Sequence, residues 1–519
     1  MSTHRVLAKS AGILGALTGI SRVLGFVRDL VIATAFGTGL GAEAFIVSFK
    51  IPNLLRDVVG EGAANAAFVP VLTECHEKKK EEFWGLASTL FIIMAAVLAV
   101  LSILGIIFSP QIVGLIAPGF VHSSDPEKFP LAVHLTQVIF PYVFLIGLSA
   151  FAMGVLNSLK EFTTSSLGPI FLNLSMIVSG YFFERAYGPM ALVVGVLAGG
   201  VLQLGCQLPA LYKRGFRIQA PVFGSSAIKK IGRLLLPRAL GSALYQINVF
   251  VDSILASFES IVGAGGQSAL YYSNRLFQLP LAIFGVALAQ AILPTFATQI
   301  VQGDMKKFKE TLSLALRSLM LVVLPASVGL VVLARPIVRI IFEHGHFNAY
   351  STAITANALF FYAFGLLSCC FIKILVNAFY AMQDTRTPVK TMMFSVTVNI
   401  ALSLLFMSRL KIGGLALASS LSATVNAGIL YYALRKKIGP LGGLQIVSSF
   451  IKIFSASVLM GAAVFFYNQG VLGPQRLSPL PWQALYLVLG ILSGIGLYVL
   501  VVWIVGVEEM REWLRGPCS

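Results

Sequence analysis

The sequence predicts an all-α polytopic membrane protein, and three observations lead to this fold class. Hydrophobic residues make up 57% of the 519-residue chain and charged residues only 11%, whereas a soluble domain carries roughly 25% charged residues. The mean hydropathy is +0.86. The apolar residues also form long continuous runs, whereas a transmembrane β-barrel would show short alternating segments.

About 14 apolar segments are long enough to cross a bilayer, which takes roughly 20 residues per helix. In chain order, the predicted spans are 10–36, 43–73, 84–109, 131–157, 163–184, 189–212, 230–257, 267–300, 310–334, 351–380, 388–408, 413–435, 446–468 and 482–506. No long polar segment remains that would form a separate soluble domain.

Alternate connections between these spans differ in their content of Lys and Arg. One set is basic and includes Lys78-Lys79-Lys80, Lys160, Lys213-Arg214, Lys229-Lys230, Lys306-Lys307, Arg386 and Arg435-Lys436-Lys437. In the other set, 37–43 and 259–267 contain no Lys or Arg. Because cytoplasmic loops are enriched in Lys and Arg, we predict that both termini are cytoplasmic. We expect no cleaved signal peptide, because charged residues interrupt the first apolar run.

A faint internal repeat organises the predicted helices. Asp29-Leu-Val-Ile-Ala-Thr34 resembles Asp252-Ser-Ile-Leu-Ala-Ser257, 223 positions later. Ala67-Phe-Val-Pro-Val-Leu72 resembles Ala291-Ile-Leu-Pro-Thr-Phe296 at an offset of 224. This offset maps the first two helices onto the seventh and eighth, so the repeats have the same orientation and are related by an axis along the membrane normal.

The repeat predicts two six-helix lobes related by a pseudo-two-fold axis. We expect an N-terminal lobe of helices 1–6 in residues 1–222 and a C-terminal lobe of helices 7–12 in residues 223–440. Residues 441–519, with helices 13 and 14, fall outside the repeat and need another role.

Charged residues lie inside the predicted spans, where each costs about 2.5–3.5 kcal/mol on insertion scales. Such residues usually face a protein interior or a water-filled cavity. In the second span, polar residues recur every three or four positions and form one helical stripe. The first two spans and the eighth contribute Ser21, Arg22, Arg28, Asp29, Lys50, Arg56, Asp57, Glu61 and Arg275.

The cationic side chains in these spans outnumber the acidic ones. Arg22, Arg28, Lys50, Arg56 and Arg275 stand against Asp29, Asp57 and Glu61. The simplest interpretation is a set of structural ion pairs, such as Arg28 with Asp29 or Glu61. A surplus of buried positive charge instead favours an anionic substrate, and the planar fork of arginine suits phosphate oxygens. A large two-lobed cavity would fit a lipid-linked pyrophosphate headgroup.

Several motifs resemble the lipid II flippase family (MurJ, also called MviN), which belongs to the multidrug/oligosaccharidyl-lipid/polysaccharide exporter superfamily. The resemblance covers essentially the whole chain. It is carried by Ser21-Arg-Val-Leu-Gly-Phe-Val-Arg-Asp29, Phe49-Lys-Ile-Pro-Asn-Leu-Leu-Arg56, Glu61-Gly-Ala63, Ala67-Phe-Val-Pro-Val-Leu72, Ala117-Pro-Gly-Phe120, Tyr271-Tyr272, Arg275-Leu276, Gly285-Val-Ala-Leu288 and Gln383-Asp384.

The resemblance implies a transporter that moves lipid II from the inner to the outer leaflet of the bacterial plasma membrane by alternating access. It implies no enzyme activity, and its partners would be lipid II, membrane lipids and other cell-wall synthesis proteins. Substrate-binding positions carried over from the family are Arg22, Arg28, Arg56, Arg275 and Lys50, with Ser21, Asp29 and Glu61 as gating or charge partners. Helices 13 and 14 would form a groove for the lipid tail.

Energy coupling and gating are less well defined by the resemblance. A sodium ion or a proton would be the coupling ion, with ligands among Asp252, Asn377, Asp384 and Thr391. Membrane potential alone would also bias the movement of a charged cavity. Asp57, Asn274 and Gln278 depart from the family pattern, so the salt-bridge gating of relatives need not transfer.

Two alternative transporters share this architecture. A flippase for another undecaprenyl-pyrophosphate-linked oligosaccharide would bind the same anionic headgroup, whereas a cation-coupled drug exporter would favour an acidic, aromatic cavity. The residues show no metal-site spacing, no Gly-rich phosphate loop and no Ser/His/Asp arrangement. The nearest approach to a metal cluster is Glu343-His344-Gly345-His346, in a predicted external loop. We therefore expect no enzyme, no metal and no nucleic-acid partner.

Overall fold

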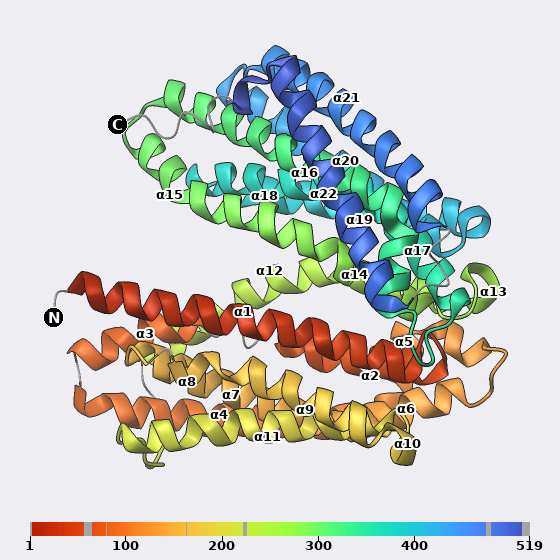
Figure 1. Cartoon of the computed structure of the whole chain (residues 1–519). Helices are drawn as coiled ribbons and strands as arrows, with labels where there is room; N and C mark the ends of the chain where they lie inside the picture. The colour runs from red at the N-terminus through yellow and green to blue at the C-terminus, as the bar shows by residue number, and fades with distance from the viewer. Residues whose placement is uncertain are drawn as a thin grey trace. The chain divides into compact units, whose positions relative to one another are not determined.

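The computed structural model describes residues 3–56, 65–78, 80–161, 163–221, 226–473 and 479–510. All regular secondary structure within these ranges is helical, which confirms the all-α prediction (Figure 1). Among the described residues, nine helices are long and apolar enough to cross a membrane. The number becomes ten if α17 (Ala349–Ala363) and α18 (Leu366–Ala381), bent by 47°, form one span. The predicted total of about 14 stays a prediction, and part of the second predicted span, 57–64, lies outside the described residues.

The chain forms two compact units. The first comprises residues 1–260 together with 345–347, and the second comprises 261–344 and 348–519. The helices of the first unit are α1 (Thr3–Phe36), α2 (Leu40–Leu55), α3 (Asn65–Lys78), α4 (Lys80–Ile107), α5 (Ser109–Ile116), η2 (Pro118–His122), α6 (Lys128–Ile139), α7 (Pro141–Ser158), α8 (Thr163–Ser166), α9 (Gly168–Phe182), α10 (Glu184–Tyr187), α11 (Met190–Lys213) and α12 (Ser226–Ala256).

The short helix α13 (Glu259–Val262) stands at the boundary between the units. The second unit contains α14 (Gly266–Pro280), the π-helical segment η3 (Leu281–Val286), α15 (Ala287–Val301), α16 (Met305–Phe342), α17, α18, α19 (Arg386–Leu410), α20 (Ile412–Ile438), α21 (Gly443–Tyr467), η4 (Asn468–Leu472) and α22 (Leu480–Val505). The first residues of the predicted second lobe fold as α12, which belongs to the first unit. The lobe boundary near residue 222 stays a prediction.

The first unit is built around close helix pairs. α11 packs against α7 and α9, α1 packs on α9, and α4 packs on α7. At Gly199 of α11, an added Cβ would lie 2.8 Å from Leu172 Cα of α9. Small residues at such contacts let helix backbones approach closely in lipid, where packing rather than the hydrophobic effect drives association.

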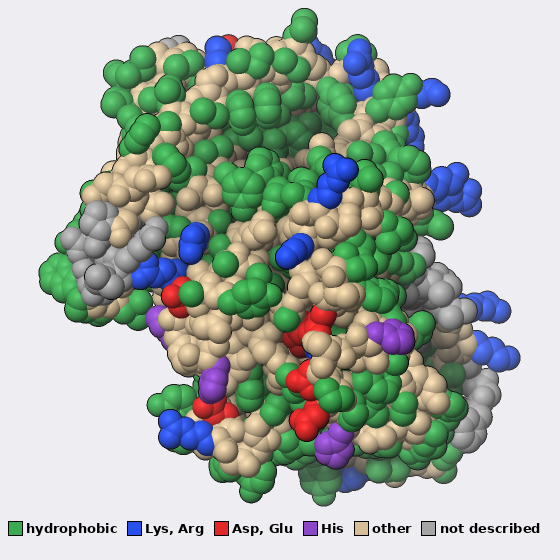
Figure 2. Space-filling view, turned by 90° about the vertical axis from the view of Figure 1, so that its right-hand side faces the viewer, with side chains coloured by type: hydrophobic (Ala, Val, Ile, Leu, Met, Phe, Trp, Pro, Cys, Tyr) green, Lys and Arg blue, Asp and Glu red, His purple; other side chains and the backbone are tan. Residues whose placement is uncertain are grey.

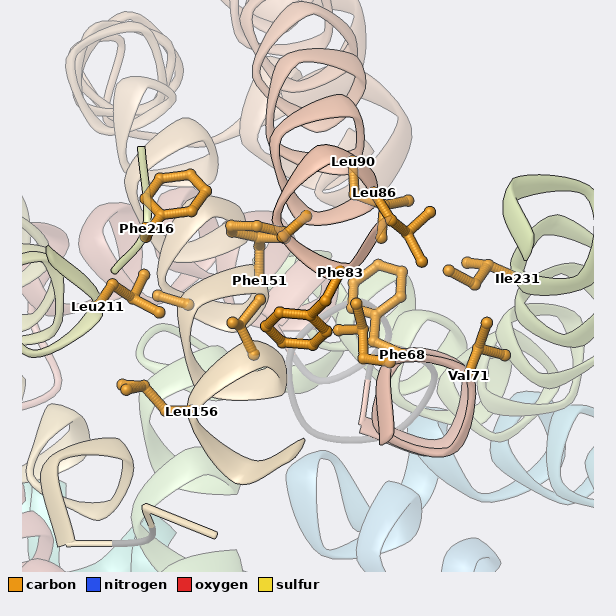
Figure 3. Packing of buried hydrophobic residues seen from close by; sticks show 14 of the residues in the cluster. Phe68, Val71, Phe83, Leu86, Leu90, Phe151, Leu156, Leu211, Phe216 and Ile231 are labelled. Atoms are coloured by element: carbon orange, nitrogen blue, oxygen red, sulfur yellow. The ribbon is translucent and has the colours of Figure 1, made fainter. Parts of the chain in front are cut away.

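A cluster of aromatic and aliphatic side chains packs inside this unit (Figure 3). Phe68 from α3, Phe83 from α4 and Phe151 from α7 pack together, and Ile231 of α12 joins them. Phe216, which follows α11, contacts Phe151. The cluster fixes α3 and α12 against the α4–α7 pair.

The second unit repeats this style of packing with different helices. α19 and α20 form the most extensive pair, and α17 and α18 both pack on α20. The last two spanning helices, α21 and α22, pack on one another, and both contact α16. Tyr498 of α22 donates a hydrogen bond to Leu321 O of α16 at 2.6 Å, so the C-terminal pair is joined to the rest of the unit.

Hydrophobic side chains cover wide areas of the face shown in Figure 2. Exposed large apolar residues are concentrated on spanning helices such as α4, α21 and α22. Exposed apolar surface of this extent is expected where helices contact lipid, because the surrounding solvent there is hydrocarbon.

Candidate functional site

Arg28 lies buried in the first unit at the centre of a hydrogen-bonded group. Its Nε and Nη2 donate to Asp29 Oδ1 at 3.0 and 2.7 Å. Its Nη1 donates to Asn173 Oδ1 of α9 at 3.0 Å. The amide of Asn173 in turn donates to the backbone oxygen of Ser21 at 3.0 Å. One asparagine therefore joins two turns of α1 to α9 and orients the guanidinium.

The Arg28–Asp29 pair is buried beside Gly25 of α1. Gly25 faces the Asn173 side chain, and a Cβ added there would lie 3.6 Å from Asn173 Nδ2. Arg28 and Asp29 are only 7% and 2% exposed, so both charges are removed from solvent. Such a pair is stable only when each charge keeps its partner, because desolvating an unpaired ion costs several kcal/mol.

The other predicted cations of the first unit are more accessible. Arg22 is exposed on α1, and Lys50 of α2 and Arg56, which follows α2, are half-buried. Lys50 interacts electrostatically with Asp252 of α12. The structure thus brings Lys50, a predicted substrate-binding residue, together with Asp252, a predicted ion ligand. Glu61 and Asp57 lie outside the described residues.

Arg275 lies on α14 in the second unit. Its guanidinium stacks over the ring of Tyr271, 4.9 Å from the ring centroid, and Nη2 donates to the Tyr271 hydroxyl at 3.2 Å. A guanidinium held over an aromatic face is oriented while it keeps its charge. The neighbouring Gln278 donates to Asn274 at 2.5 Å, so these two neutral residues satisfy each other instead of the arginine.

Three predicted ion ligands lie in the second unit, and each already has a protein partner. Asn377 donates to Ala289 O of α15 at 2.6 Å, and the Thr391 hydroxyl donates to Pro388 O at 3.0 Å. Asp384 accepts hydrogen bonds from Lys437 and from both the N–H and the hydroxyl of Thr387. The Lys437 hydrogen bond and the Thr387 backbone N–H lower the pKa of Asp384 to about 2.

These partners describe a helix-capping role for Asp384 at the start of α19. Within the described ranges, no group of three or more His, Cys, Asp or Glu side chains is arranged to hold a metal ion. Glu343 accepts a hydrogen bond from Thr352, and the His344 ring contacts Ile340 O. These two residues of the predicted external loop therefore serve local structure.

Two buried charge groups were not predicted from the sequence. In the first unit, Lys128 of α6 pairs with both Glu43 of α2 and Glu259 of α13. In the second, Arg317 of α16 pairs at 2.6 Å with Glu509, which follows α22. Lys128 and Glu259 lie at the edges of predicted spans, where sequence reasoning assigns charges to solvent. Pairing across elements far apart in the chain leaves no local sequence signal.

The chain matches a family model described as lipid II flippase MurJ over residues 32–477. It is 35% identical over 469 residues to the probable lipid II flippase MurJ of Haemophilus influenzae, covering 87% of this chain and 91% of the relative. It is 33% identical over 448 residues to the lipid II flippase MurJ of Burkholderia cenocepacia, covering 84% of each.

Solved structures show the same relationship. A lipid II flippase MurJ in an inward closed conformation aligns with a TM-score of 0.79 and 26% identity, over 95% of this chain and 98% of that one. An inward-facing multidrug resistance MATE transporter of the MOP superfamily aligns with a TM-score of 0.70 at 14% identity, which shows a shared fold. With the family model matching most of its length, this chain belongs to the MurJ family of lipid II flippases.

Proposed function

We propose that this protein flips lipid II from the inner to the outer leaflet of the bacterial plasma membrane by alternating access. The observation that carries the proposal is the match to lipid II flippases over nearly the whole chain. The many apolar helices and the likeness to an inward closed MurJ structure support a membrane transporter. The distribution of Lys and Arg supports cytoplasmic termini.

The pyrophosphate of lipid II binds to Arg22, Lys50 and Arg56 in the first unit and to Arg275 in the second. Support comes from their exposure, because each presents a cation that is exposed or only half-buried, inside or beside an apolar helix. Tyr271 holds the Arg275 guanidinium over its ring and so limits the conformations that binding must select. Phosphate oxygens accept paired hydrogen bonds from such planar groups.

Arg28 has a different part in this proposal. Because Asp29 and Asn173 occupy its guanidinium, Arg28 binds phosphate only by exchanging the Asp29 carboxylate for a substrate oxygen. Asp29 and Ser21 then act as gating partners, as does Glu61. The exchange keeps the buried cation paired throughout, which avoids the large cost of an isolated charge.

The proposal also includes a coupling ion and a surface for the lipid tail. Asp252 interacts with Lys50, so an ion or proton that reached Asp252 would change the charge at the substrate site. The pair α21 and α22, which packs on α16 and exposes many apolar side chains, provides a surface for the lipid tail. We also propose that the helices form two six-helix lobes and that the protein contacts other cell-wall synthesis proteins.

Reconstitution with defined lipids tests the function. Purified protein in proteoliposomes should expose labelled lipid II to an outside reagent faster than protein-free vesicles do. Arg22→Ala and Arg275→Ala should slow exposure at least about tenfold, the effect of one lost charge-assisted contact of roughly 1.4–3 kcal/mol. Arg185→Ala, at an exposed position on α10, is the matched control and should leave the rate unchanged.

A second lipid separates this function from its alternative. The proposal predicts preference for lipid II over an undecaprenyl pyrophosphate that carries a different oligosaccharide. Equal rates for both lipids would favour a general flippase for undecaprenyl-linked oligosaccharides. Absence of lipid II movement with wild-type protein would contradict the proposal.

A further inference from the structure

Residues 345–347 dock onto the C-terminal end of α1. The His346 N–H donates to Thr34 O at 2.8 Å. Gly345 has a φ of +56°, and a Cβ added there would lie 2.4 Å from Thr34 O. Gly37 is equally close to this loop, because a Cβ added there would lie 2.4 Å from His346 O. The contact is therefore backbone against backbone, and its closeness depends on glycine.

A second glycine lies equally close to the backbone immediately after α12. Gly119 in η2 donates its N–H to the Ser257 hydroxyl at 2.9 Å. A Cβ added at Gly119 would lie 2.1 Å from Ser257 O and 2.6 Å from Phe258 N. Any other residue at 119 would force the η2 backbone away from this turn, because real Cβ atoms do not approach a carbonyl so closely.

We call these two close backbone contacts, Gly345 with Thr34 and Gly119 with Ser257, the glycine docks. They lie at equivalent positions of the internal repeat. Thr34 and Ser257 are the last residues of the matching segments Asp29–Thr34 and Asp252–Ser257. The docking glycines, 119 and 345, are separated by nearly the same offset, 226 positions against 223. Gly119 lies in η2, after α4 and the short α5, and Gly345 lies in the loop after α16; each approaches the carbonyl that ends the repeated segment.

We infer that these two glycine docks are the two halves of one closure, which must release the ends of α1 and α12 together when this end of the protein opens. In Figure 1 both helix ends lie on the side remote from the N-terminus. With cytoplasmic termini, this is the side on which a flipped headgroup leaves. The closure does not depend on which lipid is carried, so it stands apart from the proposed substrate.

Buried charges reinforce the dock on α12. The Ser123 hydroxyl donates to Glu259 Oε2 at 2.7 Å, just beyond Ser257. Lys128 pairs with Glu259 and with Glu43 of α2, and its ammonium lies 4.5 Å from the centroid of the Phe120 ring. Separation of this dock takes Glu259 away from Lys128, so the Glu259 carboxylate must then be hydrated or find another partner. The cluster thus raises the cost of opening.

Cysteine accessibility in lipid nanodiscs tests the closure. The five native cysteines are replaced, and a reporter is placed in either dock as Thr34→Cys or Ser257→Cys. Gly119→Ala and Gly345→Ala should each speed maleimide labelling of both reporters by about tenfold or more, the response expected when one half of a two-state closure is lost. Nanodiscs expose both membrane faces, so the result does not rest on the assigned orientation.

Two glycines provide matched controls. Gly114 lies on α5 near Gly119 with no atom within 4 Å of an added Cβ, and Gly188 has a φ of +54° with equally open surroundings. Gly114→Ala and Gly188→Ala should leave labelling unchanged, which separates loss of the dock from strain at positive φ. Lys128→Met removes the charge that pairs with Glu259 beside the α12 dock, without altering a glycine, and should also speed labelling at both reporters.

Labelling rates equal to those of the controls would overturn the inference. Faster labelling at only the reporter beside the altered glycine would show two independent contacts and would contradict a single closure. If an alanine variant is not recovered as folded protein, the labelling rates of Lys128→Met decide. Rates equal to those of the controls would overturn the inference, and faster labelling of the Ser257→Cys reporter alone would contradict a single closure.

Discussion

Replacement of Lys128 by methionine gives the sharpest test of the buried charge cluster. Lys128 is 2% exposed and pairs with Glu43, also 2% exposed, and with Glu259, which is 16% exposed. Methionine has a similar length and retains contact with the Phe120 ring, so the main change is the loss of one positive charge. Two carboxylates then remain close together without their shared partner.

The expected loss of stability follows from these contacts. Each carboxylate loses a charge-assisted hydrogen bond worth about 1.5–3 kcal/mol. Removal of one partner from a buried ion pair costs about 3–5 kcal/mol, because the remaining charge stays desolvated. We therefore expect Lys128→Met to lower the free energy of unfolding by about 3–5 kcal/mol at pH 8.

The loss should depend on pH in a defined direction. Desolvation raises the pKa of Glu259, but hydrogen bonds from Lys128 and Ser123 outweigh it and leave the pKa below its ordinary value. In the wild type, this carboxylate therefore stabilises the fold above its ordinary pKa and loses that effect as pH falls. In the variant, burial beside a like charge raises the carboxylate pKa values, so acid relieves the destabilisation.

Thermal unfolding of the purified protein in detergent measures this difference at pH 8 and pH 5.5. The gap between wild type and Lys128→Met should be large at pH 8 and smaller at pH 5.5. Lys436→Met, at an exposed position at the end of α20, serves as the control and should change little at either pH. A gap at pH 8 no larger than that of the control, or one that widens in acid, would refute the reasoning.

Three further predictions concern other charges. Glu509→Gln should cost up to about 3–5 kcal/mol by unpairing buried Arg317, whereas Glu508→Gln, with a 74% exposed side chain, should change the unfolding temperature little; equal shifts would contradict this. Asp384→Asn keeps a capping side chain but removes the charge that pairs with half-exposed Lys437, so it should cost about 0.2–1 kcal/mol near neutral pH, and the difference from wild type should disappear only as pH falls toward about 2, the pKa of that carboxyl. Arg28→Lys cannot reproduce the three-point contact with Asp29 and Asn173, so lipid II exposure in proteoliposomes should fall; a wild-type rate would show that the fork is not needed.

Much of the fold was predictable because lipid imposes simple rules on sequence. Backbone groups in hydrocarbon must be satisfied within each segment, so long apolar runs predict helices directly. The pairing of helices was not predictable, since it depends on close contacts such as Gly199 with Leu172 or Gly365 with Ser420. Helical periodicity identifies a face without identifying its partner, and α12 illustrates this by packing in the first unit.

The candidate site was predicted in part. Charge within apolar runs identified Arg28 and Asp29, and the structure pairs them as the simplest interpretation expected. It did not identify Asn173, because a single polar residue in α9 has no local signal that it contacts α1. Asp384 illustrates the opposite difficulty, since a carboxylate near a predicted ion site also caps a helix. The docks at Gly119 and Gly345 appear only when distant backbone segments are seen together.

The most direct test of the central claim is the amount of lipid II exposed on the outer leaflet when this protein is depleted from its host. The proposal predicts that exposure falls on depletion and returns with the wild-type gene but not with Arg275→Ala. Normal exposure in depleted cells without another lipid II flippase would contradict the assignment and turn attention to a different undecaprenyl-linked cargo.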